Sequence, residues 1–200
     1  MLLLNDGDHT YAKVRFDETS LETIRTRLSE VPDELSRAVI WTSLWNLTRD
    51  GEWPVRSYLD TVLKHAPAES NPTLLTTAFA NAAYAINHFV GEEAREEIRA
   101  DYAERLWEVL QQAPAGSDAQ LTVARAAIQA LAATPAESGT QRLRALYDGS
   151  LDGLALDPDI RWAILRALAA RDAVSAEELE AEKERDNTLT GAAAYLGASH

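Results

Sequence analysis

The residues best suited to chemistry in this chain are its four histidines, His9, His65, His88 and His200. No two of them lie four positions apart, so the chain lacks the His-Glu-x-x-His spacing that places two zinc ligands on one helix face. Cysteine is absent from the sequence, which excludes a cysteine nucleophile, a disulfide and a thiolate metal site. The sequence also contains no G-x-S-x-G nucleophile elbow and no glycine-rich phosphate loop. On these internal features alone, we interpret the chain as catalytically silent.

The aromatic and imidazole side chains have structural interpretations. His65 and His88 fall near the C-terminal ends of predicted helices, where an imidazole can bond to free backbone carbonyls. Trp41 and Trp45 lie one helical turn apart, which favours a packed helical core over an aromatic ligand pocket.

Composition and charge narrow the class of partner. Hydrophobic residues make up 46% of the 200 residues and charged residues 26%, as in an ordinary globular protein. The net charge is −13 and no Lys/Arg cluster occurs, which argues against nucleic acid and anionic membranes as partners. The sequence contains no run of about 18 to 20 apolar residues and no signal-like start, so we expect a cytoplasmic location. The acidic segment 172–186 is interpreted as a solvated helix face with i,i+4 pairing.

Helix-starting and helix-ending residues recur along the chain. Asp17 can cap a first helix, Pro32 can begin a second one that ends before Gly51, and Asn71 with Pro72 can begin another. The pattern predicts about ten helices of roughly 10 to 20 residues, and the short connections favour antiparallel neighbours. We therefore expect an all-α fold, an irregular array of HEAT-like helical hairpins over residues 18–200. Residues 1–17 are different, because "LLLNDGDHTYAKVRFD" is rich in strand-type residues and predicts a short β-like leader.

The leader and two later segments resemble zinc metallopeptidases of the aminopeptidase N family. "NDGDHTYAKVRFD" resembles the junction at which a β-sandwich domain of that family leads into a C-terminal helical domain. The matching positions are Asn5, Tyr11, Lys13, Val14, Phe16 and Asp17. Residues 36–75 and 156–191 are similar to helices of that domain in actinobacterial members.

The resemblance implies a non-catalytic domain of a larger enzyme. The family's enzymes remove N-terminal residues from peptides with one zinc ion, and their helical domain forms a curved, bowl-like wall that restricts access to the substrate cavity. The family's Gly-x-Met-x-Asn loop is missing because Met1 is the sole methionine. The resemblance thus implies no catalytic or metal residue and no cofactor in this chain, with zinc in the parent enzyme. Its implied partners are the catalytic and β-sandwich domains of the parent chain and a peptide substrate.

Four arginines are candidates for contacting the carboxylate of a peptide on such a wall. They are Arg56, Arg125, Arg142 and Arg161, and surface ion pairing is the plainer interpretation of each. The alternative function is a free-standing helical-repeat scaffold that binds peptide or protein partners on a concave face. A small-molecule-sensing regulator is disfavoured, because such proteins usually carry a basic DNA-reading helix.

Overall fold

A computed structural model of the chain describes residues 14–199. Across this range the regular structure is entirely helical, with ten α-helices, two short 3-10 helices and no strand. The predicted all-α class is therefore confirmed. Most of the predicted β-like leader lies outside the described residues, and residues 14–17 form neither helix nor strand.

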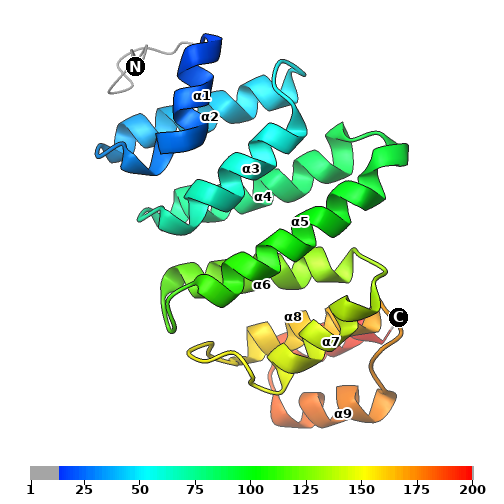
Figure 1. The fold of residues 1–200 in the computed structure, drawn as a ribbon. Helices are drawn as coiled ribbons and strands as arrows, with labels where there is room; N and C mark the ends of the chain where they lie inside the picture. Colours follow the sequence, from blue (N-terminus) through cyan, green and yellow to red (C-terminus); the bar gives the residue numbers. More distant parts are fainter. Residues whose placement is uncertain (1–13, 200) are drawn as a thin grey trace. The chain divides into compact units, whose positions relative to one another are not determined.

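The helices follow one another with short connections. Those up to residue 112 are α1 (Glu18–Arg27), η2 (Leu28–Glu30), α2 (Glu34–Arg49), α3 (Val55–His65), η3 (Ala66–Ala68), α4 (Pro72–Phe89) and α5 (Glu92–Gln112). The others are α6 (Asp118–Ala132), α7 (Glu137–Tyr147), α8 (Pro158–Ala169), α9 (Ala176–Arg185) and α10 (Leu189–Ala198) (Figure 1). The chain divides into two compact units, Met1–Ile98 and Arg99–His200, and the boundary falls inside α5.

Side-chain caps fix the beginnings of several helices, as the sequence predicts. The Asp17 carboxylate accepts the backbone N–H of Ser20 at 2.7 Å to begin α1, and Asn71 caps α4 with Pro72 in its first turn. The predicted start of α2 at Pro32 is wrong by two residues. Asp33 is the N-cap instead, because its carboxylate accepts the backbone N–H of Ser36 at 2.7 Å.

The core of the first unit lies among α2, α3 and α4. The helices α3 and α4 form an antiparallel hairpin that packs against α2 (Figure 1). Tyr58 and Val62 on α3 are buried together with Ile40 and Leu44 on α2. His65 continues the same face of α3 and is 2% exposed, so a polar side chain ends an otherwise apolar stripe.

In the second unit α8 is the central helix and contacts α6, α7 and α10. Its Ile160, Ile164, Leu165 and Leu168 side chains are fully buried. Trp162 on the same helix packs against Leu179, Ala194 and Ala198, which joins α9 and α10 to the unit. A helix that is apolar on almost every side suits this enclosed position.

Candidate functional site in the first unit

A polar cavity lies where the N-terminal end of α2 meets the C-terminal end of α3. It has a volume of about 190 Å³, and its lining residues include Ser29, Arg37, Trp41, His65 and Glu69. Two charged groups and an imidazole are unusual on the inner side of a helical core, because burial of charge is costly unless the charge is paired. The partners of these three side chains therefore decide what the cavity can do.

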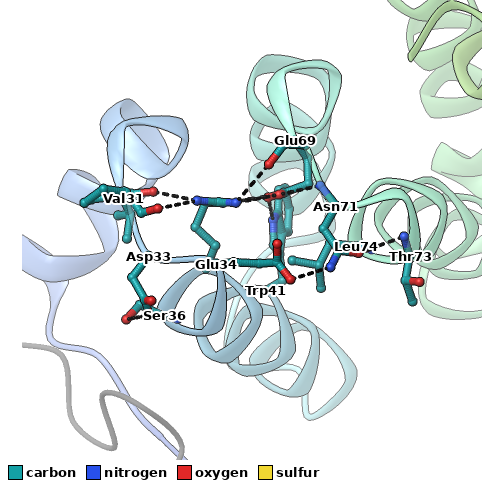
Figure 2. A network of polar contacts seen from close by, with 12 residues as sticks. Val31, Asp33, Glu34, Ser36, Trp41, Glu69, Asn71, Thr73 and Leu74 are labelled. Carbon is teal, nitrogen blue, oxygen red and sulfur yellow. Dashed lines mark hydrogen bonds and ion pairs between the residues drawn. The ribbon is translucent and has the colours of Figure 1, made fainter. Parts of the chain in front are cut away.

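Arg37 and Glu69 form a buried ion pair beside the cavity, with side-chain exposures of 11% and 2%. The Nε of Arg37 donates to both carboxylate oxygens of Glu69, at 3.2 and 3.1 Å, and Nη2 donates to Oε1 at 3.0 Å. On its other side the guanidinium donates to the carbonyl oxygens of Val31 at 2.9 Å and Pro32 at 3.1 Å. In Figure 2, Val31 and Glu69 lie apart from each other, and dashed lines from both lead to the space between them. The pair thus connects the segment before α2 with the segment before α4.

The Glu69 carboxylate has further donors. It accepts the indole N–H of Trp41 at 3.4 Å and the backbone N–H of Asn71 at 3.2 Å (Figure 2). Burial raises the pKa of Glu69, but the hydrogen bonds from Arg37 and the Asn71 backbone outweigh burial, so the pKa lies below its usual value. Asn71 also caps α4 and donates to the Glu34 carboxylate at 2.7 Å.

His65 uses both ring nitrogens. Its Nε2 lies 2.7 Å from the carbonyl oxygen of Arg25, and its Nδ1 lies 3.2 Å from the backbone nitrogen and 2.8 Å from the hydroxyl of Ser29. A carbonyl can only accept and a backbone N–H can only donate, so the ring is the neutral tautomer with its proton on Nε2. Burial lowers the pKa of His65, which further favours this neutral form. The predicted bond to a helix-terminal carbonyl is thus present at His65.

His88 has different surroundings from those predicted. Its exposed ring stacks on Tyr84, with ring centroids 4.1 Å apart, and makes no bond to a helix-terminal carbonyl among residues 14–199. Tyr84 itself contacts Trp45 and Phe89, at centroid distances of 6.0 and 5.6 Å. Trp45 is half-buried, whereas Trp41 is 6% exposed and belongs to the core.

The polar groups around the cavity are bonded mainly to one another and to the backbone. The five N–H groups of the Arg37 guanidinium point to Glu69, Val31, Pro32 and Ser70, so none is left over for a ligand. The sequence does not predict this network, because Arg37 and Glu69 are 32 residues apart. The available signal was a charged residue one turn before Trp41, on a helix that is otherwise apolar on that side.

The four arginines proposed from the sequence are not joined in one network. Arg56, on α3, pairs with Glu97 at 3.0 Å, and both side chains are exposed. Arg142, on α7, forms a bidentate pair with Glu104 at 2.7 and 2.6 Å, with its guanidinium 5.3 Å from the Trp107 ring centroid. Arg125, on α6, is exposed, and no carboxylate among the described residues is paired with it.

Arg161 is a buried structural group. Its Nε and Nη2 donate to the Glu182 carboxylate at 2.8 and 2.7 Å, and Nη2 also donates to the Tyr147 hydroxyl at 2.9 Å. The side chains of Arg161 and Glu182 are 12% and 2% exposed. Asp186 accepts the indole N–H of Trp162 at 2.9 Å and is 8% exposed. The interpretation of segment 172–186 as a solvated face is therefore wrong for these two acids, because donors on α8 capture them.

The described part of the chain offers no metal centre and no membrane span. Within residues 14–199, no three His, Cys, Asp or Glu side chains gather as a metal would require. No helix in this range is long and apolar enough to cross a membrane.

The comparisons with known proteins agree with the fold. The family model described as ERAP1-like C-terminal domain matches residues 1–199. Aminopeptidase N of Streptomyces lividans is 40% identical over 193 residues, which cover 96% of this chain and 22% of that relative. The chain thus spans about a fifth of the length of this relative, and the resemblance stated from the sequence is confirmed. The chain belongs to the ERAP1-like C-terminal domain family and is a C-terminal helical domain of the aminopeptidase N type.

Proposed function

We propose that this chain is the non-catalytic C-terminal domain of a zinc-dependent aminopeptidase that removes N-terminal residues from peptides. In this proposal the domain walls the substrate cavity and restricts access to it. The observation that carries the proposal is the match to Aminopeptidase N over 96% of this chain and only 22% of the relative. Most of the relative has no counterpart in this chain, which leaves room elsewhere for the catalytic groups.

Zinc chemistry is assigned to the parent enzyme and not to the described residues. Residues 14–199 contain no set of ligands that fits the ion, so we derive no catalytic step from them. The proposed partners are the catalytic and β-sandwich domains of the parent, with residues 1–17 as the end of the β-sandwich and 18–200 as the helical domain. We propose a cytoplasmic location and neither nucleic acid nor membrane as a partner, in keeping with the net charge of −13.

Arg125 is the arginine that we propose for contact with the peptide carboxylate. The other three candidates already bind carboxylates of this chain, namely Glu97, Glu104 and Glu182. No carboxylate among residues 14–199 is paired with Arg125, so its guanidinium is available for a bidentate pair with a substrate carboxylate.

The first test is the parent reading frame. The proposal expects a His-Glu-x-x-His motif upstream of this segment, and a natural start at Met1 would instead favour the free-standing helical-repeat scaffold.

The second test uses the full-length enzyme. Arg125→Gln is expected to raise KM about tenfold for short peptides, because a charged hydrogen bond is worth about 1.5 to 3 kcal/mol. KM for an aminoacyl-nitroanilide, which has no carboxylate at the far end, is expected to stay unchanged. Arg166→Gln, on an exposed position of α8, is the matched control. An unchanged KM for peptides would remove Arg125 from the proposal and leave the domain assignment in place.

A further inference from the structure

The imidazole of His65 completes the backbone hydrogen bonding where α1 ends. Ser29 comes four residues after Arg25, so its N–H is the one that would bond to the Arg25 carbonyl if the α-helix continued. Instead the His65 ring lies between the two groups, with Nε2 at 2.7 Å from the carbonyl oxygen and Nδ1 at 3.2 Å from the Ser29 nitrogen. A side chain of α3 thus replaces one backbone bond at the junction of α1 and η2.

These hydrogen bonds are compatible only with the neutral His65 ring. In the neutral ring, the Nδ1 lone pair accepts the N–H of Ser29 and its hydroxyl. An imidazolium would carry hydrogens on both nitrogens, so its Nδ1–H would face the N–H of Ser29. The Ser29 hydroxyl can turn to accept the new proton, but the Ser29 N–H then loses its acceptor.

The charged groups of α1 and η2 around the ring are already paired. On α1, Arg25 lies 4.0 Å from the carboxylate of Asp60, which belongs to α3. On η2, Glu30 accepts a hydrogen bond from Arg27 at 2.6 Å. These two carboxylates are therefore shared with arginines and stabilise an added positive charge less than a free carboxylate would.

The charged groups on the cavity side and on α3 also give little stabilisation to a positive charge on the His65 ring. Glu69 is bonded to Arg37 at 3.0 Å, and Lys64 adds a positive charge next to His65 in the sequence. The polar cavity of about 190 Å³ that His65 lines provides room for water beside the ring. A proton can thus reach the ring from the cavity, and the carboxylates named here, Asp60, Glu30 and Glu69, each already have an arginine partner.

We propose that His65 links α3 to α1 and η2 through hydrogen bonds that only its neutral ring can make, so that mild acid breaks the link. Protonation at Nδ1 releases η2 and α1 from α3, while α2, α3 and α4 keep their packing around Ile40, Leu44 and Val62. The fully buried apolar side chains of this segment are two, Ile24 on α1 and Leu28 on η2, so apolar burial contributes less here than among α2, α3 and α4. The helix that follows the leader is therefore the part of the first unit that opens first in mild acid.

The experiment is hydrogen exchange of the whole 200-residue chain, followed by NMR between pH 7.5 and pH 5. After correction for intrinsic exchange, protection of Ser29 and of α1 is expected to fall by up to tenfold per pH unit as the pH drops from the usual histidine pKa of 6.5 towards the lower pKa of the folded ring, as one-proton linkage requires. Protection of α3 and α4 is expected to change by less than twofold. This range lies above the usual carboxylate pKa values, so the Asp17 cap stays ionised throughout.

Two variants separate His65 from other titrating groups. His65→Gln removes the titration and is expected to give protection of α1 that does not vary with pH. His88→Gln alters an exposed histidine of α4 and is expected to behave like the wild type. If His65→Gln does not fold, the wild-type ring titration decides by itself. A ring pKa at or above 6.5, flat α1 protection from pH 7.5 to pH 5, or an unchanged pH dependence in His65→Gln would each overturn the proposal.

Discussion

At the residue scale, each unit has a buried ion pair that ties segments distant in sequence. The pair of Arg37 and Glu69 joins the segments that precede α2 and α4, and the pair of Arg161 and Glu182 joins α8 to α9. In both pairs the guanidinium also bonds to a carbonyl or hydroxyl oxygen of a third segment. A buried pair is a weak source of net stability, but removing one partner leaves an uncompensated buried charge. We therefore expect these pairs to act mainly by specifying which segments meet.

The variant Glu69→Gln tests this effect at the first pair. Neutralising Glu69 while keeping its shape removes the carboxylate that is bonded to the Arg37 guanidinium, whose side chain is 11% exposed. We expect the free energy of unfolding, measured with urea at pH 7.5, to fall by about 3 kcal/mol. The matched control is Glu97→Gln, which breaks the exposed pair with Arg56 and is expected to change stability by less than about 0.5 kcal/mol. Equal effects of the two variants would contradict the role assigned to burial.

At the element scale, the start of α9 has a complete capping box. The Ser175 hydroxyl accepts the N–H of Glu178 at 3.2 Å, and the Glu178 carboxylate accepts the N–H of Ser175 at 2.8 Å. Arg144 on α7 donates to the same carboxylate. The hydrogen bonds from Arg144 and from the Ser175 backbone lower the pKa of Glu178 to about 2.

The lowered pKa of Glu178 gives a pH dependence of defined sign. A carboxylate with a depressed pKa in the folded state stabilises the fold above its unfolded value of 4.5, and this contribution is lost as the pH falls from 4.5 towards 2. We expect Glu178→Gln to be about 1 kcal/mol less stable than wild type at pH 7, because Gln keeps the capping box but loses the charge that pairs with Arg144. Denaturant unfolding at several pH values should show the two proteins converging by pH 2. Glu177→Gln, at an exposed position in the same turn, is the matched control.

A comparison of two glycines after α7 distinguishes the effect of backbone strain from the effect of close packing. Gly149 and Gly153 have nearly equal positive φ angles, +78° and +80°. A Cβ on Gly149 would meet Leu156 Cδ1 at 3.7 Å, an ordinary contact, whereas a Cβ on Gly153 would lie 2.4 Å from the Gly116 nitrogen. Gly116 and Gly153 thus belong to two turns that lie against each other. Gln120 also links these turns, since its side chain donates to the Asp152 carbonyl at 2.7 Å.

We therefore expect different costs for the same substitution at the two glycines. Gly149→Ala should lower the free energy of unfolding by about 1 kcal/mol, from the left-handed backbone alone. Gly153→Ala carries this cost and must also push the two turns apart, so it should lose at least about 2 kcal/mol more. Thermal or urea unfolding of both variants measures the difference, and losses of the same size would refute the close approach.

At the scale of the whole molecule, the chain corresponds to one part of a larger relative. It covers 22% of Aminopeptidase N from Streptomyces lividans, and residues 14–199 contain no cluster of metal ligands. We expect the purified 200-residue chain to release no nitroaniline from aminoacyl-nitroanilides, with or without added zinc. The full-length parent is the positive control in the same assay. Zinc-dependent turnover by the chain alone would contradict the proposal that this domain is non-catalytic.

The sequence by itself determined the helices and the family. Capping residues such as Asp17 and Asn71, and the apolar spacing of α3, act within one or two turns, so they can be read along the chain. The tertiary structure alone decided that Arg37 meets Glu69, that His65 bridges Arg25 and Ser29, and that Arg161 captures Glu182. From the sequence alone, each of these polar side chains could equally well face solvent. Its actual partner is chosen by helix packing, because a buried charge or imidazole must be satisfied by whichever group the neighbouring helix brings within reach.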